Sequence, residues 1–171
     1  METLVRDYMT RDPITVPPTA TIEQAAQEMR VHDVGALLLI EDGQLVGLVT
    51  DRDLTVRGAA NGADPVTTPV AEVATPAPVS LHPEQPLAQA IDEMARQAVR
   101  RLPVVEHGRP VGILSLGDLA IARADGSDGG APDAVDALGE ISAAEGPSAR
   151  QAAMEQGTPN TRVPGPRGDL P

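Results

Sequence analysis

The sequence lacks several residue types that particular functions require. It has no cysteine among its 171 residues, which excludes disulfides, thiolate zinc sites and cysteine nucleophiles. Tyr8 is the single aromatic residue, so the platforms on which single-stranded nucleic acids stack are missing and any core must be aliphatic. No apolar run reaches 18 residues, and no export signal is recognisable. A soluble cytoplasmic protein is therefore expected.

Positive charge is also scarce. The 13 basic residues are all arginine, and they stand against 25 aspartates and glutamates, which gives a formal net charge of −12 at pH 7. The summed field of such a chain repels nucleic acid and anionic membranes. We therefore expect a protein that binds neither of them.

The short motifs of common catalytic chemistry are absent from the sequence. There is no Gly-x-Ser-x-Gly, no His-Glu-x-x-His and no phosphate-cradling Gly-Lys-Ser/Thr. The histidines are His32, His82 and His107, and none of them has a partner at metal-ligand spacing. The sequence therefore predicts no enzyme, no catalytic residues and no metal site.

The main pattern in the sequence is an internal repeat. Residues 5–56 align with residues 70–121 at an offset of 65 without a gap, and about 16 of the 52 pairs are identical. The segment 47–53 recurs as 112–118, where an apolar run leads through glycine to a hydroxyl residue, with an aspartate three positions later. The identities fall on turn glycines, prolines and periodic apolar positions, so the two repeats should share one backbone.

Each repeat predicts the element order β-α-β-β-α. In the first repeat, Thr21 and Gln24 form a capping box that begins a helix, and Asp42-Gly43 between two apolar runs is a strong hairpin signal. The expected elements are a lead-in helix at 4–9, a strand at 14–16, a helix from 21 to about 32, strands at 36–40 and 45–49, and a helix from 50 to about 57.

The second repeat predicts the same elements after a connector rich in Gly, Pro, Asn and Thr. These are a lead-in at 70–73, a strand at 79–81, a helix with the apolar face Leu87, Ala90, Ile91 and Met94, strands at 102–105 and 111–114, and a helix at 115–123. The predicted fold class is α+β, in α/β-like layers with helices covering one side of the hairpins.

The repeat also suggests domain boundaries. We divide the chain into a first domain at 1–60, a linker at 61–69, a second domain at 70–124 and a tail at 125–171. In the tail, 14 of 47 residues are Gly or Pro, and the few apolar residues cannot offset its ordering entropy. We expect this acidic tail to be disordered.

These motifs resemble a known family. The tandem β-α-β-β-α units, the Thr/Ser-x-x-Asp after each hairpin and the Arg-Arg-Leu-Pro-Val-Val at 100–105 look like a pair of cystathionine-β-synthase (CBS) domains over about residues 3–123. Within the family the chain is similar to the small actinobacterial hypoxic-response type, with no attached enzyme or transporter. The resemblance implies two units packed by pseudo-twofold symmetry, a homodimer formed through helices, and adenine nucleotides (AMP, ADP, ATP) or S-adenosylmethionine as regulatory ligands.

Two equivalent motifs are the candidate binding sites. Thr50 and Ser115 each stand between a strand and a helix, where free N–H groups and the helix dipole favour a phosphate. An aspartate in the first turn can accept two hydrogen bonds from a ribose diol. The family pattern assigns Thr50 and Ser115 to phosphate and Asp53 and Asp118 to ribose. The other interpretation is a helix capping box without a ligand, worth about 1 kcal/mol, and the two can coexist.

The resemblance also implies apolar walls for an adenine ring. These walls would be Ile14, Ala36 and Leu37 in the first repeat, and Val79, Arg101 and Leu102 in the second. For Leu37 and Leu102, plain core packing is the alternative. Arg52 in the first repeat, and Arg100 and Arg101 in the second, are candidate counter-charges for phosphate, with surface ion pairs as the alternative.

Two functions remain open at this point. The first is a non-catalytic regulatory module that senses an adenosyl ligand in the clefts and changes an unknown protein partner or its own dimer. The second is a homodimeric scaffold or stress protein of the same fold with empty clefts. Pro103 of the second hairpin is replaced by Leu38 in the first, so Ser115 and Asp118 are favoured over Thr50 and Asp53 as the occupied site.

Overall fold

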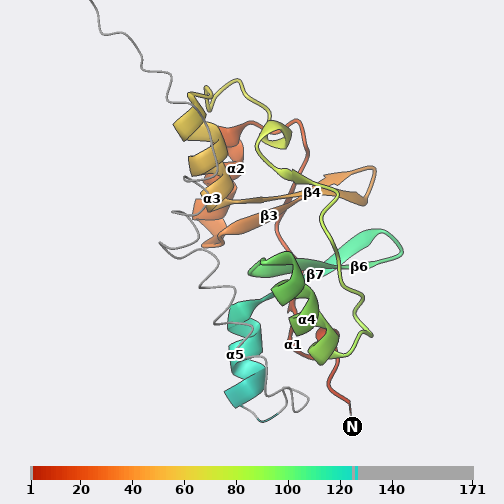
Figure 1. Ribbon diagram of the computed structural model, residues 1–171. Coiled ribbons are helices and arrows are strands. Elements are labelled where there is room, and N and C mark those ends of the chain that lie inside the picture. The colour runs from red at the N-terminus through yellow and green to blue at the C-terminus, as the bar shows by residue number, and fades with distance from the viewer. Residues whose placement is uncertain (1, 125, 127–171) are drawn as a thin grey trace, which may run out of the picture.

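The computed structural model describes residues 2–124 and 126, and the predicted disordered tail falls outside them apart from Gly126. Figure 1 shows two similar halves, each a hairpin with helices beside it. The first repeat contains α1 (Val5–Tyr8), β1 (Thr10–Arg11), β2 (Thr15–Val16), α2 (Ile22–His32), β3 (Ala36–Glu41), β4 (Gln44–Thr50), α3 (Asp51–Asp53), the π-helix η1 (Leu54–Gly58) and the 3₁₀ turn η2 (Ala59–Asn61).

The second repeat follows the same plan. It contains the 3₁₀ turn η3 (Val70–Glu72), β5 (Thr75–Pro76), α4 (Leu87–Gln97), β6 (Arg101–Glu106), β7 (Arg109–Ser115) and α5 (Leu116–Ala124). The mixed α+β class and the tandem arrangement that we expected are confirmed.

Local sequence explains where these elements begin and turn. Thr21 and Gln24 form the predicted capping box, with Thr21 N donating to Gln24 Oε1 over 2.9 Å. Both hairpins turn through two residues with positive φ, which matches the right-handed twist of the strands. The turn residues are Asp42 and Gly43 in the first repeat and His107 and Gly108 in the second, with φ of 51° and 78° and of 52° and 79°.

The strands form two sheets that exchange their edge strands. The order is β2-β3-β4-β5 in one sheet and β1-β7-β6 in the other. Thr10 of the first repeat therefore pairs with Ile113 of the second, and Thr75 of the second pairs with Leu48 of the first. Each hairpin thus receives the short lead-in strand of the other repeat.

The two aliphatic cores show the same exchange. Val5 is fully buried among Leu81, Leu87 and Met94 of the second repeat, and Figure 1 shows α1 beside α4 and α5. Conversely, Val70 is fully buried among side chains of the first repeat that include Ile22 and Leu37. The predicted domain boundaries stay a prediction, but neither core is complete without residues from the other repeat.

One predicted strand is wrong. Residues 79–81 do not form a strand, and only Leu81 makes a bridge, to Val104. In the first repeat, Leu38 N donates to Ile14 O over 3.1 Å and extends the pairing of β2 with β3. The equivalent of Leu38 is Pro103, which has no N–H to donate, so the pairing shrinks to one bridge.

Candidate functional site

Two cavities lie beside the Thr/Ser-x-x-Asp motifs. The Ser115 cavity measures about 290 Å³ and is lined by Thr10, Asp12, Pro13, Ile14, His32, Val34, Gly35, Ala36, Leu38, Arg101, Ile113, Ser115 and Asp118. The Thr50 cavity measures about 430 Å³ and is lined by Leu48, Thr50, Asp51, Arg52, Asp53, Arg57, Thr75, Ala98, Val99, Arg100 and Arg101. Both fall in or near the size range of small-molecule sites.

The two cavities are related by the repeat. Seven residues that line the Ser115 cavity have their equivalent, 65 positions earlier or later in the sequence, in the lining of the Thr50 cavity. The pairs are Thr10/Thr75, Val34/Val99, Gly35/Arg100, Ala36/Arg101, Ile113/Leu48, Ser115/Thr50 and Asp118/Asp53. Thr10 lies on β1 and Thr75 on β5, the edge strands that pair with the hairpin of the other repeat. This strand exchange therefore contributes one lining residue to each cavity.

Each cavity combines a motif from one repeat with walls from the other. Ile14 and Ala36 of the first repeat face the same cavity as Ser115 and Asp118 of the second. Arg100 and Arg101 of the second repeat line the cavity of Thr50 and Asp53. A molecule in either cavity would therefore touch both halves of the protein.

The structure places the remaining predicted wall residues elsewhere. Leu37 and Leu102 are 0% and 3% exposed and belong to the two cores, in line with the core-packing alternative. Val79 is 41% exposed and lines neither cavity. Sequence reasoning missed Leu38, Ile113 and Thr10, although the identity of Thr10 and Thr75 across the repeat was a usable signal.

Both motifs form capping boxes with the same geometry. In the second repeat, Ser115 N and Ser115 Oγ donate to Asp118 Oδ2, each over 2.7 Å. In the first repeat, Thr50 N and Thr50 Oγ1 donate to Asp53 Oδ2 over 2.9 and 2.7 Å. In each motif the cap uses Oδ2 of the aspartate, so the second carboxylate oxygen remains for another donor.

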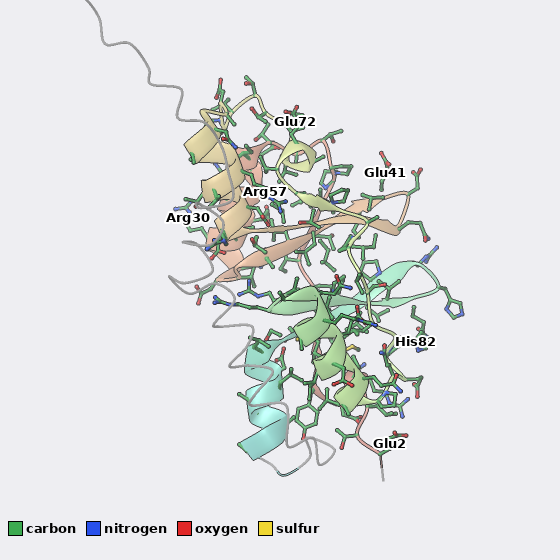
Figure 2. All side chains as sticks on the ribbon, in the orientation of Figure 1. Glu2, Arg30, Glu41, Arg57, Glu72 and His82 are labelled. Carbon is green, nitrogen blue, oxygen red and sulfur yellow. The ribbon has the colours of Figure 1, made fainter. Side chains whose placement is uncertain are left out.

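That second oxygen differs between the repeats. Asp53 Oδ1 lies 3.4 Å from Nε of Arg57, which is labelled in Figure 2. The same arginine donates to Val73 O and Thr75 Oγ1. The position equivalent to Arg57 is Ala122, whose methyl group cannot form an ion pair. Asp118 Oδ1 therefore has no counterpart of the Arg57 contact, and Asp118 is the aspartate better placed to accept hydrogen bonds from a ligand.

The predicted counter-charges gather at one cavity. Arg52, Arg100 and Arg101 all line the Thr50 cavity, where Arg57 joins them. Arg101 also reaches the Ser115 cavity, because its Nη1 donates to Gly35 O over 3.3 Å. Sequence reasoning had divided these arginines between the two repeats and had missed Arg57.

The described part of the chain contains neither a metal-binding cluster nor a membrane-spanning helix. Among residues 2–124 and 126, no group of three or more His, Asp or Glu is placed to hold a metal ion. None of the described helices combines the length and the apolar character needed to cross a membrane.

Comparisons with known proteins agree with this arrangement. The CBS domain family matches residues 5–58 and 70–125. The CBS domain-containing protein YhcV of Bacillus subtilis is 43% identical over 126 residues, covering 74% of this chain and 89% of YhcV. Hypoxic response protein 1 of Mycobacterium tuberculosis is 36% identical over 119 residues, covering 69% and 83% of the two chains.

Solved structures show the same fold. The crystal structure of Hypoxic Response Protein I with two coordinated zinc ions is 36% identical, with a TM-score of 0.64 over 70% of this chain and 98% of that one. The CBS pair of protein MJ0100, in complex with 5′-methylthioadenosine and S-adenosylmethionine, is 26% identical, with a TM-score of 0.67 over 74% and 99%. A CBS domain protein of Pyrobaculum aerophilum, complexed with AMP, is 28% identical, with a TM-score of 0.64 over 71% and 94%.

The family match covers well over half of the chain, and the two cavities follow the same repeat that defines it. The chain belongs to the CBS-domain family and carries its domains as a tandem pair.

Proposed function

We propose that this protein is a non-catalytic regulatory module that binds an adenine nucleotide or a related adenosyl ligand in the Ser115 cavity. The observation that carries the proposal is the composition of that cavity. Apolar side chains of Ile14, Ala36 and Leu38 face it together with Ser115 and the Asp118 carboxylate. An apolar enclosure with a few convergent polar groups is the usual form of a small-molecule site.

Each part of the cavity suits one part of an adenosyl ligand. Ile14 and Leu38 offer apolar surface to a purine ring, which gains free energy by leaving water. Asp118 Oδ1 can accept hydrogen bonds from the two hydroxyl groups of a ribose. The 5′ substituent then lies toward Ser115 and the first turn of α5. Relatives solved with AMP and with 5′-methylthioadenosine and S-adenosylmethionine support this class of ligand.

The placement of the walls suggests how binding could regulate. Ile14 and Ala36 belong to the first repeat, and Ser115 and Asp118 to the second, so a bound ligand contacts both. A ligand shifts a conformational equilibrium when it binds one arrangement of its contacts better than another. The ligand would therefore stabilise one arrangement of the two repeats, and a partner protein would bind that arrangement preferentially.

A thermal-shift titration tests the proposal. The full chain is titrated with AMP, ADP, ATP, 5′-methylthioadenosine and S-adenosylmethionine. A ligand present at 100 times its dissociation constant should add about 2.7 kcal/mol to the free energy of unfolding, which raises Tm on the order of 10 °C for a chain of this size. If none of the five ligands raises Tm, the adenosyl proposal is wrong, and the alternative hypothesis of a homodimeric scaffold with empty clefts is favoured.

Cytoplasmic location stays a prediction from composition.

We also expect the protein to form a homodimer. Val56 and Ile121 occupy equivalent positions in the two repeats and are 49% and 58% exposed, so a second copy could cover both. Light scattering at tens of micromolar should report twice the chain mass of 17.7 kDa. A monomer mass under those conditions would contradict the dimer.

A further inference from the structure

We propose that a third cavity of this protein, the Arg11 cavity, binds a free basic amino acid such as lysine. Five charged residues line the cavity, together with an apolar surface that includes Met9 and Val111. The charged residues are Arg6, Arg11, Asp12, Glu84 and Glu106. The cavity measures about 500 Å³, within the usual range of small-molecule sites. It contains neither Thr/Ser-x-x-Asp motif, so the inference does not depend on adenosyl binding.

Both repeats build the Arg11 cavity. The first repeat supplies Arg6, Arg11 and Asp12, which reach the second sheet because β1 pairs with β7. The second repeat supplies Glu84 and, from its hairpin, Glu106. An ion pair between Arg6 and Glu84 joins the two sides. The cavity therefore exists only because the repeats exchange their lead-in segments.

Three of the charged groups in the cavity are available to a ligand. Arg6 and Glu84 neutralise each other. Within residues 2–124 and 126, no opposite charge lies within 4.0 Å of the charged atoms of Arg11, Asp12 or Glu106. Arg11 Nη2 donates to Arg6 O over 3.5 Å, which orients the guanidinium group and leaves its other N–H groups for a ligand. The cavity thus offers one cation and two carboxylates.

A basic amino acid carries the complementary set of charges. At pH 7, lysine has one carboxylate and two ammonium groups. The carboxylate can accept paired N–H groups from Arg11, and the ammonium groups can donate to Asp12 and Glu106. The methylene chain of lysine can pack on Met9 and Val111. Lysine has a net charge of about +1, so the field of a chain with a charge of −12 attracts it.

The equivalent hollow of the other sheet lacks this set of charges. This Glu41 cavity measures about 390 Å³, and Glu41 is the one charged residue in its lining. Glu41 stands 65 positions before Glu106. At the positions of Arg6, Arg11 and Glu84 the Glu41 cavity has Ala71, Pro76 and Thr19. The shared backbone explains why both hollows exist, but the unpaired cation and the second carboxylate belong to the Arg11 cavity alone.

An NMR titration of the full chain with L-lysine tests the inference. We expect millimolar affinity, because exposed ion pairs contribute little each, and shifts of the amide signals of Arg11, Glu106 and Val111. The variants R11Q and E106Q should each bind lysine about two- to fivefold more weakly than the native chain. Neither residue lines the Ser115 or Thr50 cavity, so both variants should keep the native affinity for an adenosyl ligand.

The controls separate local contacts from the summed field of the protein. E41Q removes the same charge as E106Q at the equivalent position, and R30Q removes an arginine that lines neither hollow (Figure 2 labels both residues). Each control should change lysine affinity less than about 1.5-fold. Cadaverine is lysine without the carboxylate, and norleucine is lysine without the side-chain ammonium group. Both should bind at least about twofold more weakly than lysine, and R11Q should not weaken cadaverine binding.

Asp118→Asn should leave lysine affinity unchanged, whatever it does to an adenosyl ligand, so the two proposals can fail separately. The inference is overturned if lysine at tens of millimolar shifts none of the three amide signals, or if E41Q weakens binding as much as E106Q. It is also overturned if cadaverine or norleucine binds as tightly as lysine, because the cavity would then attract cations or zwitterions in general.

Discussion

Asp118→Asn is expected to weaken the binding of AMP or 5′-methylthioadenosine by about 10- to 100-fold. Hydrogen bonds to a charged group are worth about 1.5–3 kcal/mol, and about 1.4 kcal/mol corresponds to a factor of ten in affinity. The asparagine keeps the size of the side chain and one acceptor oxygen for the cap with Ser115. It loses the negative charge, and its amide group donates where a ribose hydroxyl must also donate. Isothermal titration calorimetry measures the change.

Asp53→Asn is the matched control for this variant. Asp53 occupies the equivalent position, makes the same cap with Thr50, and has its second oxygen beside Arg57. The two variants should lose similar amounts of stability from the weakened caps, but Asp53→Asn should change adenosyl affinity less than threefold. If the two substitutions reduce affinity equally, or if Asp53→Asn has the larger effect, the assignment of the adenosyl site to the Ser115 cavity is wrong.

Val5→Asp should lower the free energy of unfolding by at least about 3 kcal/mol, or prevent folding altogether. Val5 is fully buried in the core of the second repeat, where its neighbours Leu81, Leu87 and Met94 offer no partner for a charge. Val31→Asp is the matched control, because Val31 is 69% exposed on α2. That substitution should change the stability by no more than about 0.5 kcal/mol. Urea denaturation followed by circular dichroism measures both.

The exchange of lead-in segments can be tested with milder variants. Val5 N donates to Gln85 O and Leu87 N donates to Thr3 O, each over 2.9 Å, so Val5 and Leu87 lie in one packed region. Val5→Ala and Leu87→Ala should therefore couple by about 0.5–3 kcal/mol in a double-mutant cycle. Val5→Ala and Leu37→Ala should be additive within about 0.5 kcal/mol, since Leu37 belongs to the other core. Coupling to Leu37 instead of Leu87 would show that α1 packs on its own repeat.

The parts of the fold that depend on neighbouring residues were predictable from the sequence. The capping box of Thr21 and Gln24, the hairpin turns at Asp42-Gly43 and His107-Gly108, and the buried face of α4 follow from short-range patterns, and the structure contains all of them. The repeat then allows each prediction to be transferred from the first copy to the second. This transfer is wrong for the strand predicted at 79–81, because Pro103 stands at the position of Leu38 and has no N–H with which to pair that strand.

The strand exchange was not predictable in this way. The strands β1 and β5 have only two residues each, and nothing in Thr10–Arg11 or Thr75–Pro76 indicates which hairpin they join. Their partners lie about 100 and 30 positions away, so the choice depends on tertiary packing.

The candidate site likewise has a part that the sequence predicts and a part that depends on tertiary packing. The hydroxyl and carboxylate of each motif were found because they are close in sequence, and the structure places all four beside cavities. From the sequence, the wall residues of each repeat were assigned to the motif of the same repeat. In the structure, each cavity takes walls from the repeat that does not carry its motif. For the same reason, the gathering of Arg52, Arg57, Arg100 and Arg101 at one cavity appears only once the two repeats are packed together.

A crystal structure of the full chain soaked with AMP tests the central claim most directly. We predict that the adenine ring lies against Ile14 and Leu38, with the ribose hydroxyl groups within about 3 Å of Asp118 Oδ1. Density for AMP with its ribose at Asp53, or no density in the Ser115 cavity at concentrations that raise Tm in solution, would contradict the account.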